Sequence, residues 1–141
     1  MDTGSERWKV VCDLLNSSPF YHYMDMKVVE TGEGYAKLTL MARKQHQNLY
    51  GTVHGGALAS VLDSSCTIAV GTLMEEDEVA VTVDMRINYI SNISEGLLVG
   101  EGRVLHRGSR TGVAQGEVRD EKGKLLAAGM STLFINRPQF D

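Results

Sequence analysis

The feature that most constrains the fold is a long, almost uncharged stretch from Gly55 to Leu73. Within it, mostly apolar side chains recur at steps of three and four residues, which is the period of a helix. The stripe consists of Leu58, Val61, Leu62, Ser65, Ile68, Ala69 and Thr72. An exposed helix of this length would carry several charges, yet Asp63 is the only charged residue here. The sequence therefore predicts a helix that is buried on most sides.

Asp63 needs an explanation, because an unpaired carboxylate is costly to remove from water. Its neighbours one helical turn away are Ala59, Ser60, Cys66 and Thr67, which are small or weakly polar and typical of a groove wall. We interpret Asp63 as a catalytic carboxylate. The alternative is a structural carboxylate that caps another element or pairs across a dimer.

The pair Gly55-Gly56 precedes this helix and leaves backbone N–H groups uncovered at its positive end. Such groups suit a carbonyl oxygen that gains negative charge, although a tight turn alone would also explain two glycines. Asp63 lies about 12 Å further along the helix, given a rise of about 1.5 Å per residue. One helix cannot bring both groups to one small reacting centre. Either a substrate spans the gap, or a second copy of the chain supplies one of the two groups.

The motif that carries a family resemblance runs from Asn48 through His54-Gly55-Gly56 to Asp63, and continues with Thr82-Val83-Asp84. In these residues and their order the chain resembles the hotdog-fold acyl-CoA thioesterases, and within them the phenylacetic-acid-degradation, or PaaI-like, type. The similarity in layout extends over nearly the whole chain, so we expect a single domain from residue 1 to residue 141.

The resemblance implies an α+β hotdog fold, in which a long central helix is wrapped by a curved antiparallel sheet of about six strands. It also implies hydrolysis of aryl- or fatty-acyl-CoA to the free acid and coenzyme A. The site would lie at a homodimer interface, where Asn48 and Gly55 of one subunit face Asp63 and Thr82 of the other. Related proteins often pair two dimers, so a dimer of dimers is expected. No cofactor is implied beyond the coenzyme A of the substrate.

Each candidate residue has a chemical role and a plainer alternative. Asp63 would activate water as a general base or attack the thioester directly, and the sequence leaves both open. The Gly55 N–H would polarise the carbonyl, and the Asn48 amide would hold water or the carbonyl unless it only bonds its own loop. The Thr82 hydroxyl would orient the water or Asp63, unless it is an ordinary strand residue. His54 would shape the turn or touch the thioester.

A basic turn follows later in the chain and could hold the phosphates of coenzyme A. It consists of Arg107, Gly108, Ser109, Arg110 and Thr111, which we group with Gly56 as candidate substrate-binding residues. The alternative is a solvated hairpin tip. The four histidines, His22, His46, His54 and His106, show no ligand spacing, so no metal site is expected.

Charge and composition limit the classes of binding partner and the location expected for this protein. A net charge of −4 offers no general attraction for nucleic acid or an anionic membrane. The most hydrophobic stretch contains Asp63 and several hydroxyl residues, which argues against a membrane-spanning segment. The first residues lack the pattern of a signal peptide, so a cytoplasmic protein is expected. Cys12 and Cys66 are interpreted as buried free thiols.

Periodicity predicts the remaining elements. A first helix should run from an N-cap at Ser5 to about Leu15. The aromatic segment 20–23 should serve as a lid or connector near the groove or, more commonly, as core. A solvated connector is expected at the acidic run 75–78. Strands are predicted at 26–31, 35–41, 79–89, 97–106, 111–120 and 124–136.

Two strand details are specific enough to test. Along the strand at 79–89, one side should hold Val79, Val81, Val83, Met85, Ile87 and Tyr89. Small residues recur inside the last three strands, where something must approach closely. They are Gly100, Gly102, Ala114, Gly116, Ala127 and Gly129, and we expect the central helix to lie against them.

Two other functions share this fold. A catalytically silent acyl-CoA sensor would keep the pocket without the chemistry. An acyl thioester hydratase or dehydratase resembles a different pattern, with a histidine and an acid placed for proton transfer at the acyl chain. That pattern is absent from this sequence.

Overall fold

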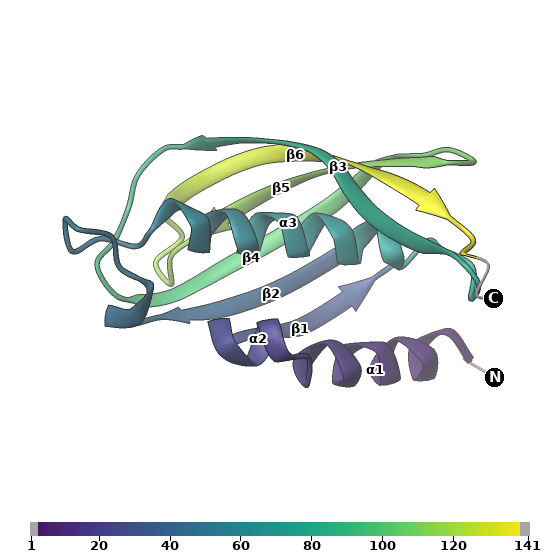
Figure 1. Ribbon diagram of the computed structural model, residues 1–141, viewed down its shortest axis with the longest axis horizontal. Helices are drawn as coiled ribbons and strands as arrows, with labels where there is room; N and C mark the ends of the chain where they lie inside the picture. Colours follow the sequence, from purple (N-terminus) through teal and green to yellow (C-terminus); the bar gives the residue numbers. More distant parts are fainter. Residues whose placement is uncertain (1–2, 139–141) are drawn as a thin grey trace.

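A long helix lies in the curve of a six-stranded antiparallel sheet in the computed structural model, which describes residues 3–138 (Figure 1). The helices are α1 (Thr3–Asn16), α2 (Pro19–Met24) and α3 (Gly55–Gly71), with a short 3-10 turn at Lys44–His46. The strands are β1 (Met26–Gly32), β2 (Tyr35–Ala42), β3 (Val79–Tyr89), β4 (Gly96–Arg107), β5 (Thr111–Arg119) and β6 (Leu125–Asn136). Their order in the sheet is β1-β2-β4-β5-β6-β3. The predicted central helix, six strands and antiparallel meander are confirmed.

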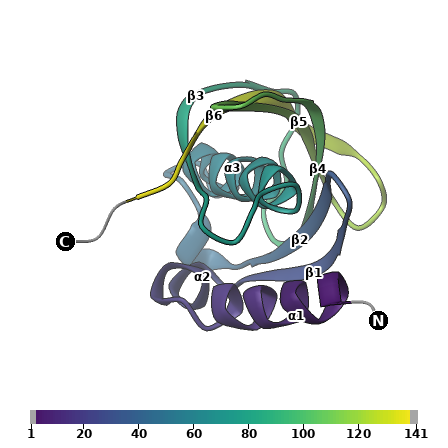
Figure 2. The ribbon, with the colours of Figure 1, turned by 90° about the vertical axis from the view of Figure 1, so that its right-hand side faces the viewer.

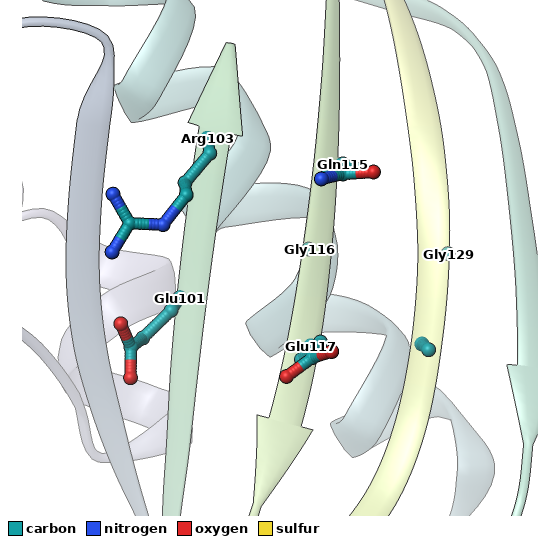
Figure 3. Close-up of a pocket in the computed structure, with 7 residues that line it drawn as sticks. Glu101, Arg103, Gln115, Gly116, Glu117 and Gly129 are labelled. Carbon is teal, nitrogen blue, oxygen red and sulfur yellow. The ribbon is translucent and has the colours of Figure 1, made fainter. Parts of the chain in front are cut away.

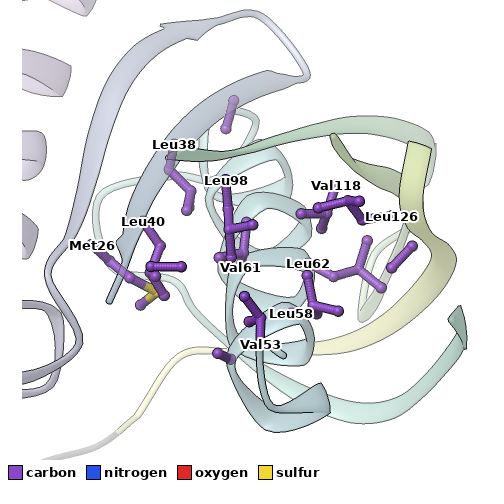
Figure 4. Packing of buried hydrophobic residues seen from close by; sticks show 14 of the residues in the cluster. Met26, Leu38, Leu40, Val53, Leu58, Val61, Leu62, Leu98, Val118 and Leu126 are labelled. Carbon is purple, nitrogen blue, oxygen red and sulfur yellow. The ribbon is translucent and has the colours of Figure 1, made fainter. Parts of the chain in front are cut away.

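The core forms where α3 meets the concave face of the sheet. Val61 and Leu62 of α3 are fully buried, and they face buried side chains of β2, β4, β5 and β6 (Figure 4). On β2, alternate residues Ala36, Leu38, Leu40 and Ala42 are buried, as the period of two predicted.

The small residues of the sheet make room for α3. A Cβ added at Gly116 would lie 2.7 Å from Leu62 Cδ1. One added at Gly102 would collide with the backbone carbonyl of Ser65, and one at Gly100 with the side chain of Val61. The expected close approach of helix and sheet is confirmed, and it explains why glycine is tolerated inside these strands.

Strand β3 forms as predicted, but its two faces are not continuous. Its register against β6 shifts between Thr82 and Asp84, which marks a β-bulge. Before the bulge, Val79 and Val81 are exposed; after it, Met85 and Ile87 pack against the core. The prediction of one apolar side from Val79 to Tyr89 is therefore wrong, because the bulge moves the alternation by one residue.

The N-terminal segment differs from its prediction in two ways. Helix α1 begins at Thr3, so Ser5 lies inside the first turn and is not the N-cap. The aromatic segment forms α2, in which Tyr21 is buried while Phe20 and Tyr23 are 54% and 79% exposed. The interpretation as core therefore holds for Tyr21 alone. Both helices lie alongside β1 (Figure 2).

The acidic connector after α3 is not fully solvated. The Glu78 side chain is only 3% exposed and pairs with the Arg107 guanidinium at 2.5 Å. It also accepts the Glu75 N–H at 2.8 Å. A carboxylate can be buried here because it has both a cation and a backbone donor, neither of which a charge run predicts.

The two cysteines are free, Cys66 buried and Cys12 half-buried. Burial raises the pKa of the Cys66 thiol to about 12. In the part of the chain that the structure describes, no helix has the length and hydropathy needed to cross a membrane.

Candidate functional site

One side of α3 is left without a strand. Figure 2 shows the sheet curving round the helix and leaving it open between β3 and α2. The side chains on this open face are half-buried, in contrast to the fully buried Val61 and Leu62. They are Ala59, Ser60, Asp63, Ser64 and Thr67. The predicted small, weakly polar groove wall is present, except that Cys66 lies on the buried side.

Asp63 and Thr82 meet on this open face. The Thr82 hydroxyl donates to Asp63 Oδ1 at 2.7 Å, and the Thr67 hydroxyl lies 3.4 Å from that of Thr82. The β-bulge that follows Thr82 lets this residue face α3 while Met85, further along, faces the core. The structure therefore brings these two predicted site residues together within one chain.

Helix α2 borders the same face. Burial raises the pKa of the Tyr21 hydroxyl, and the nearby Asp63 carboxylate adds to the rise. Ser64 is also a neighbour of this hydroxyl. Tyr21 of the aromatic segment thus lies close to the groove, as one of the two interpretations of that segment expected.

The N-terminus of α3 is shaped by His54. His54 is the N-cap, and its Nδ1 accepts the Gly56 N–H at 2.8 Å. The predicted role of His54 in shaping the turn is thus present. Its backbone carbonyl accepts the Ala57 N–H at 2.9 Å. Among residues 3–138 the Gly55 N–H has no acceptor, so this donor is the one available to a ligand.

Asn48 is engaged in its own loop. Its Oδ1 accepts the backbone N–H groups of Tyr50 at 2.9 Å and Thr52 at 3.2 Å, and its Nδ2 donates to Thr52 Oγ1 at 2.9 Å. This geometry is the local-turn alternative named above. Asn48 still lies with Gly55 on one pocket of about 320 Å³.

That pocket contains a residue that the sequence reasoning missed. Tyr89, at the end of β3, lines it together with Asn48 and Gly55. The Tyr89 hydroxyl donates to the Gly55 carbonyl at 3.2 Å. A strand pattern placed Tyr89 only on an apolar side, and no local signal links residue 89 to residue 55.

The candidate residues thus form two groups, which lie at two different points along the unbroken helix α3. Gly55 lies at its start with Asn48 and Tyr89, whereas Asp63 lies further along with Thr82. The separation along the helix axis is about 12 Å. The two groups of one folded chain are therefore too far apart to act on one small reacting centre, as the sequence predicted.

The basic turn is partly committed to the fold. Arg107 binds Glu78, the carbonyl of Leu73 at 3.5 Å and the carbonyl of Gly108. The Gly108 N–H donates to the Thr111 carbonyl at 2.8 Å, which closes the turn. Ser109 and Arg110 are exposed and line a hollow of about 440 Å³.

Another hollow, of about 420 Å³, lies on the β4-β5-β6 part of the sheet (Figure 3). Glu101, Arg103 and Glu117 line it, with none of the predicted site residues. The Tyr35 hydroxyl donates to Glu101 at 2.8 Å, and the Arg103 guanidinium lies 4.5 Å from the centroid of the Tyr35 ring. Burial, followed by the Glu101 hydrogen bond and charge, raises the pKa of Tyr35 to about 12.

Over the described residues, no group of three or more His, Cys, Asp and Glu side chains is arranged to hold a metal ion.

Comparison with known proteins identifies a family of enzymes. The family model for the thioesterase superfamily matches residues 50–127. A 1,4-dihydroxy-2-naphthoyl-CoA hydrolase from Escherichia coli is 27% identical over 113 residues, which cover 80% of this chain and 83% of that protein.

Solved structures of other proteins share the fold of this chain. A conserved protein from Pseudomonas aeruginosa superposes with a TM-score of 0.80 at 33% identity, covering 84% of this chain and 94% of that one. A thioesterase from Haemophilus influenzae superposes with a TM-score of 0.82 at 20% identity, covering 88% of this chain and 87% of that one.

Proposed function

Because this chain belongs to the thioesterase superfamily and has the hotdog fold, we propose that it hydrolyses acyl-CoA thioesters to a free acid and coenzyme A. The observation that carries the proposal is the hydrogen bond from Thr82 to Asp63 on the open face of α3. It holds a half-buried carboxylate in a fixed orientation where a substrate can reach it.

Asp63 supplies the attacking group in this proposal. Its Oδ1 accepts a hydrogen bond from the Thr82 hydroxyl, which leaves Oδ2 to take a proton from water or to attack the thioester carbon. As a general base, Asp63 would deliver hydroxide to the carbonyl in one step. As a nucleophile, it would form a mixed anhydride that water then hydrolyses. Both routes use the same carboxylate position.

The Gly55 N–H stabilises the oxyanion that forms on the carbonyl. It is a backbone donor at the positive end of α3, and no described acceptor occupies it. A donor that is already oriented toward the developing charge contributes about 10²–10³ in rate in other hydrolases. Asn48 borders the same pocket and would contact the substrate there.

A homodimer resolves the distance between the two groups. Strand β3 is an edge of the sheet, and Val79, Val81 and Val83 on it are 44%, 56% and 62% exposed. An exposed edge strand rich in valine favours pairing with another strand. If two copies meet along β3, Gly55 of one chain can face Asp63 of its partner. A further pairing of dimers is part of the same proposal.

The substrate class is proposed more narrowly from the motif and the relatives. The Asn48, Gly55 and Asp63 pattern favours the PaaI-like type, and the naphthoyl-CoA hydrolase relative favours an aromatic acyl group. Phosphates of coenzyme A would contact Ser109 and Arg110, since Arg107 is occupied by Glu78. We propose that the enzyme works in the cytoplasm and without an added cofactor.

Thiol release tests the function. Purified protein is assayed with phenylacetyl-CoA, benzoyl-CoA, acetyl-CoA and palmitoyl-CoA, beside Asp63→Asn and the control Asp13→Asn. Asp13 is an exposed carboxylate on α1, outside the motif and not on β3. We expect Asp63→Asn to lower kcat by about 10²–10⁴-fold and the control to leave it unchanged.

Three outcomes contradict parts of the proposal. Equal rates for Asp63→Asn and wild type would remove Asp63 from the mechanism. Acyl-CoA binding without thiol release would favour a silent sensor. Hydration of an enoyl-CoA without thiol release would favour the hydratase class.

A further inference from the structure

Tyr89 lies directly over the first residue of α3. Its hydroxyl donates to the Gly55 carbonyl at 3.2 Å, and its ring atoms Cε1 and Cζ lie 3.2 Å from where a Cβ on Gly55 would be. The ring therefore packs on the bare face of Gly55 while the hydroxyl binds its backbone. Glycine at position 55 leaves room for this contact.

The Gly55-Gly56 pair needs such contacts, because glycine has the largest backbone freedom of any residue. The peptide before Gly55 is held by the bond from the Ala57 N–H to the His54 carbonyl. The peptide after it is held at the Gly56 N–H by His54 and at the Gly55 carbonyl by Tyr89. With both adjoining peptides held, the direction of the Gly55 N–H is set.

Strand β3 also connects the two groups of the site. Thr82, before the bulge, binds Asp63, and Tyr89, at the end of the strand, binds Gly55. A single strand thus holds both functional positions of α3. Tyr89 remains 54% exposed and lines the pocket of about 320 Å³ that Gly55 and Asn48 share.

We propose that Tyr89 is a positioning residue for thioester hydrolysis: by binding the Gly55 carbonyl, it directs the Gly55 N–H at the substrate carbonyl, and its ring forms one wall of the pocket that receives the thioester. This inference rests on the proposed function. A donor is effective only if it already points at the position of the oxyanion before the reaction. A less ordered Gly55 should therefore reduce stabilisation of the transition state more than it reduces substrate binding.

The test compares Tyr89→Phe, which keeps the ring, with Tyr89→Leu, which removes it, in the full-length protein. We expect Tyr89→Phe to lower kcat about tenfold with KM within about twofold, since only the hydrogen bond is lost. Tyr89→Leu should lower kcat similarly and raise KM as well. Tyr23→Phe, a change to a 79% exposed tyrosine on α2, serves as the control and should match wild type.

A second measurement separates positioning from general stability. Amide hydrogen exchange at Gly56, whose N–H is bonded to His54 Nδ1 and belongs to the peptide that Tyr89 holds, should be at least several-fold faster in Tyr89→Phe, while the melting temperature stays close to that of wild type. Wild-type kcat in Tyr89→Phe, or unchanged exchange at Gly56, would overturn the inference and leave the proposed function standing. Absence of thiol release by the wild-type protein would instead overturn the proposed function, and this inference with it.

Discussion

The Asp63–Thr82 pair shows how little the site needs to orient its carboxylate. One hydroxyl at 2.7 Å orients Asp63, and none of the cations whose side chains the structure describes forms an ion pair with it. The orientation of Asp63 therefore depends on a single neutral donor, the Thr82 hydroxyl.

Removing that donor should weaken catalysis without unfolding the chain. Thr82→Val preserves the branched shape but removes the hydroxyl, and we expect kcat/KM for thiol release to fall about tenfold. Thr82→Ser keeps the donor and should stay within about threefold of wild type. Full activity in Thr82→Val would show that Asp63 is oriented by something else.

His54 contributes to the site through the start of α3. Its Nδ1 caps the helix by accepting the Gly56 N–H at 2.8 Å. His54→Ala should lower the free energy of unfolding by about 1 kcal/mol, measured by urea denaturation. His54→Asn supplies another cap acceptor and should recover most of that loss. If both variants equal wild type, the cap contributes no stability.

Tyr35 links stability to alkaline pH. Its pKa is raised to about 12, so its neutral, hydrogen-bonded form contributes fully below the unfolded value near 10. The contribution is lost as the pH rises from about 10 toward 12, because the unfolded chain releases this proton first. We expect the free energy of unfolding of the wild-type protein to exceed that of Tyr35→Phe by about 1 kcal/mol at pH 8, measured by urea denaturation. The difference should shrink between pH 10 and 11.5, and a constant difference would contradict this linkage.

Among the elements, the contact between α3 and the strands depends on small residues. Gly102 of β4 is the sharpest case, since an added Cβ would strike the Ser65 carbonyl in α3. Backbone cannot shift as easily as a flexible side chain can. The approach of helix and strand is therefore set by glycine itself.

We expect Gly102→Ala to lower the free energy of unfolding by about 3 kcal/mol or more in chemical denaturation. Gly32→Ala is the matched control, because its nearest atom would be Tyr35 Cδ1 at 4.0 Å. That variant should remain within about 0.5 kcal/mol of wild type. A small loss in Gly102→Ala would mean that α3 can move away from the sheet without cost.

For the molecule as a whole, the proposed site is complete only if two copies meet along the open edge at β3. The separation of Gly55 from Asp63 cannot be closed within one rigid helix. In the proposed homodimer, association along β3 covers the exposed valines and joins the two groups. Activity and assembly should therefore be lost together.

The double variant Val81→Lys/Val83→Lys places like charges on both copies at this edge. We expect its mass in solution to fall to the 15.5 kDa of one chain and thiol release to fall at least about 10²-fold. Val29→Lys changes a valine of β1, at the other edge, that is 53% exposed, and should leave mass and activity unchanged. A fully active monomer would contradict the shared site.

Much of the fold was determined by local sequence. The three- and four-residue period of the segment that became α3 specifies an apolar helix, and the period of two specifies β2, whatever their partners. Asp63 stands out because it is the only charge in that helix, and the recurring glycines indicate a close approach. The resemblance that the Asn48 to Asp63 motif carries then points to thioester chemistry.

Only the tertiary structure decided which groups meet. The bulge after Thr82 depends on pairing with β6, and the Glu78–Arg107 pair joins the connector after α3 to the end of β4, which is distant in the sequence. Asn48 is bonded within its loop, and Tyr89 reaches Gly55 from the far end of β3. Periodicity reports which face of an element is apolar, whereas register and side-chain contacts depend on partners that the local sequence does not contain.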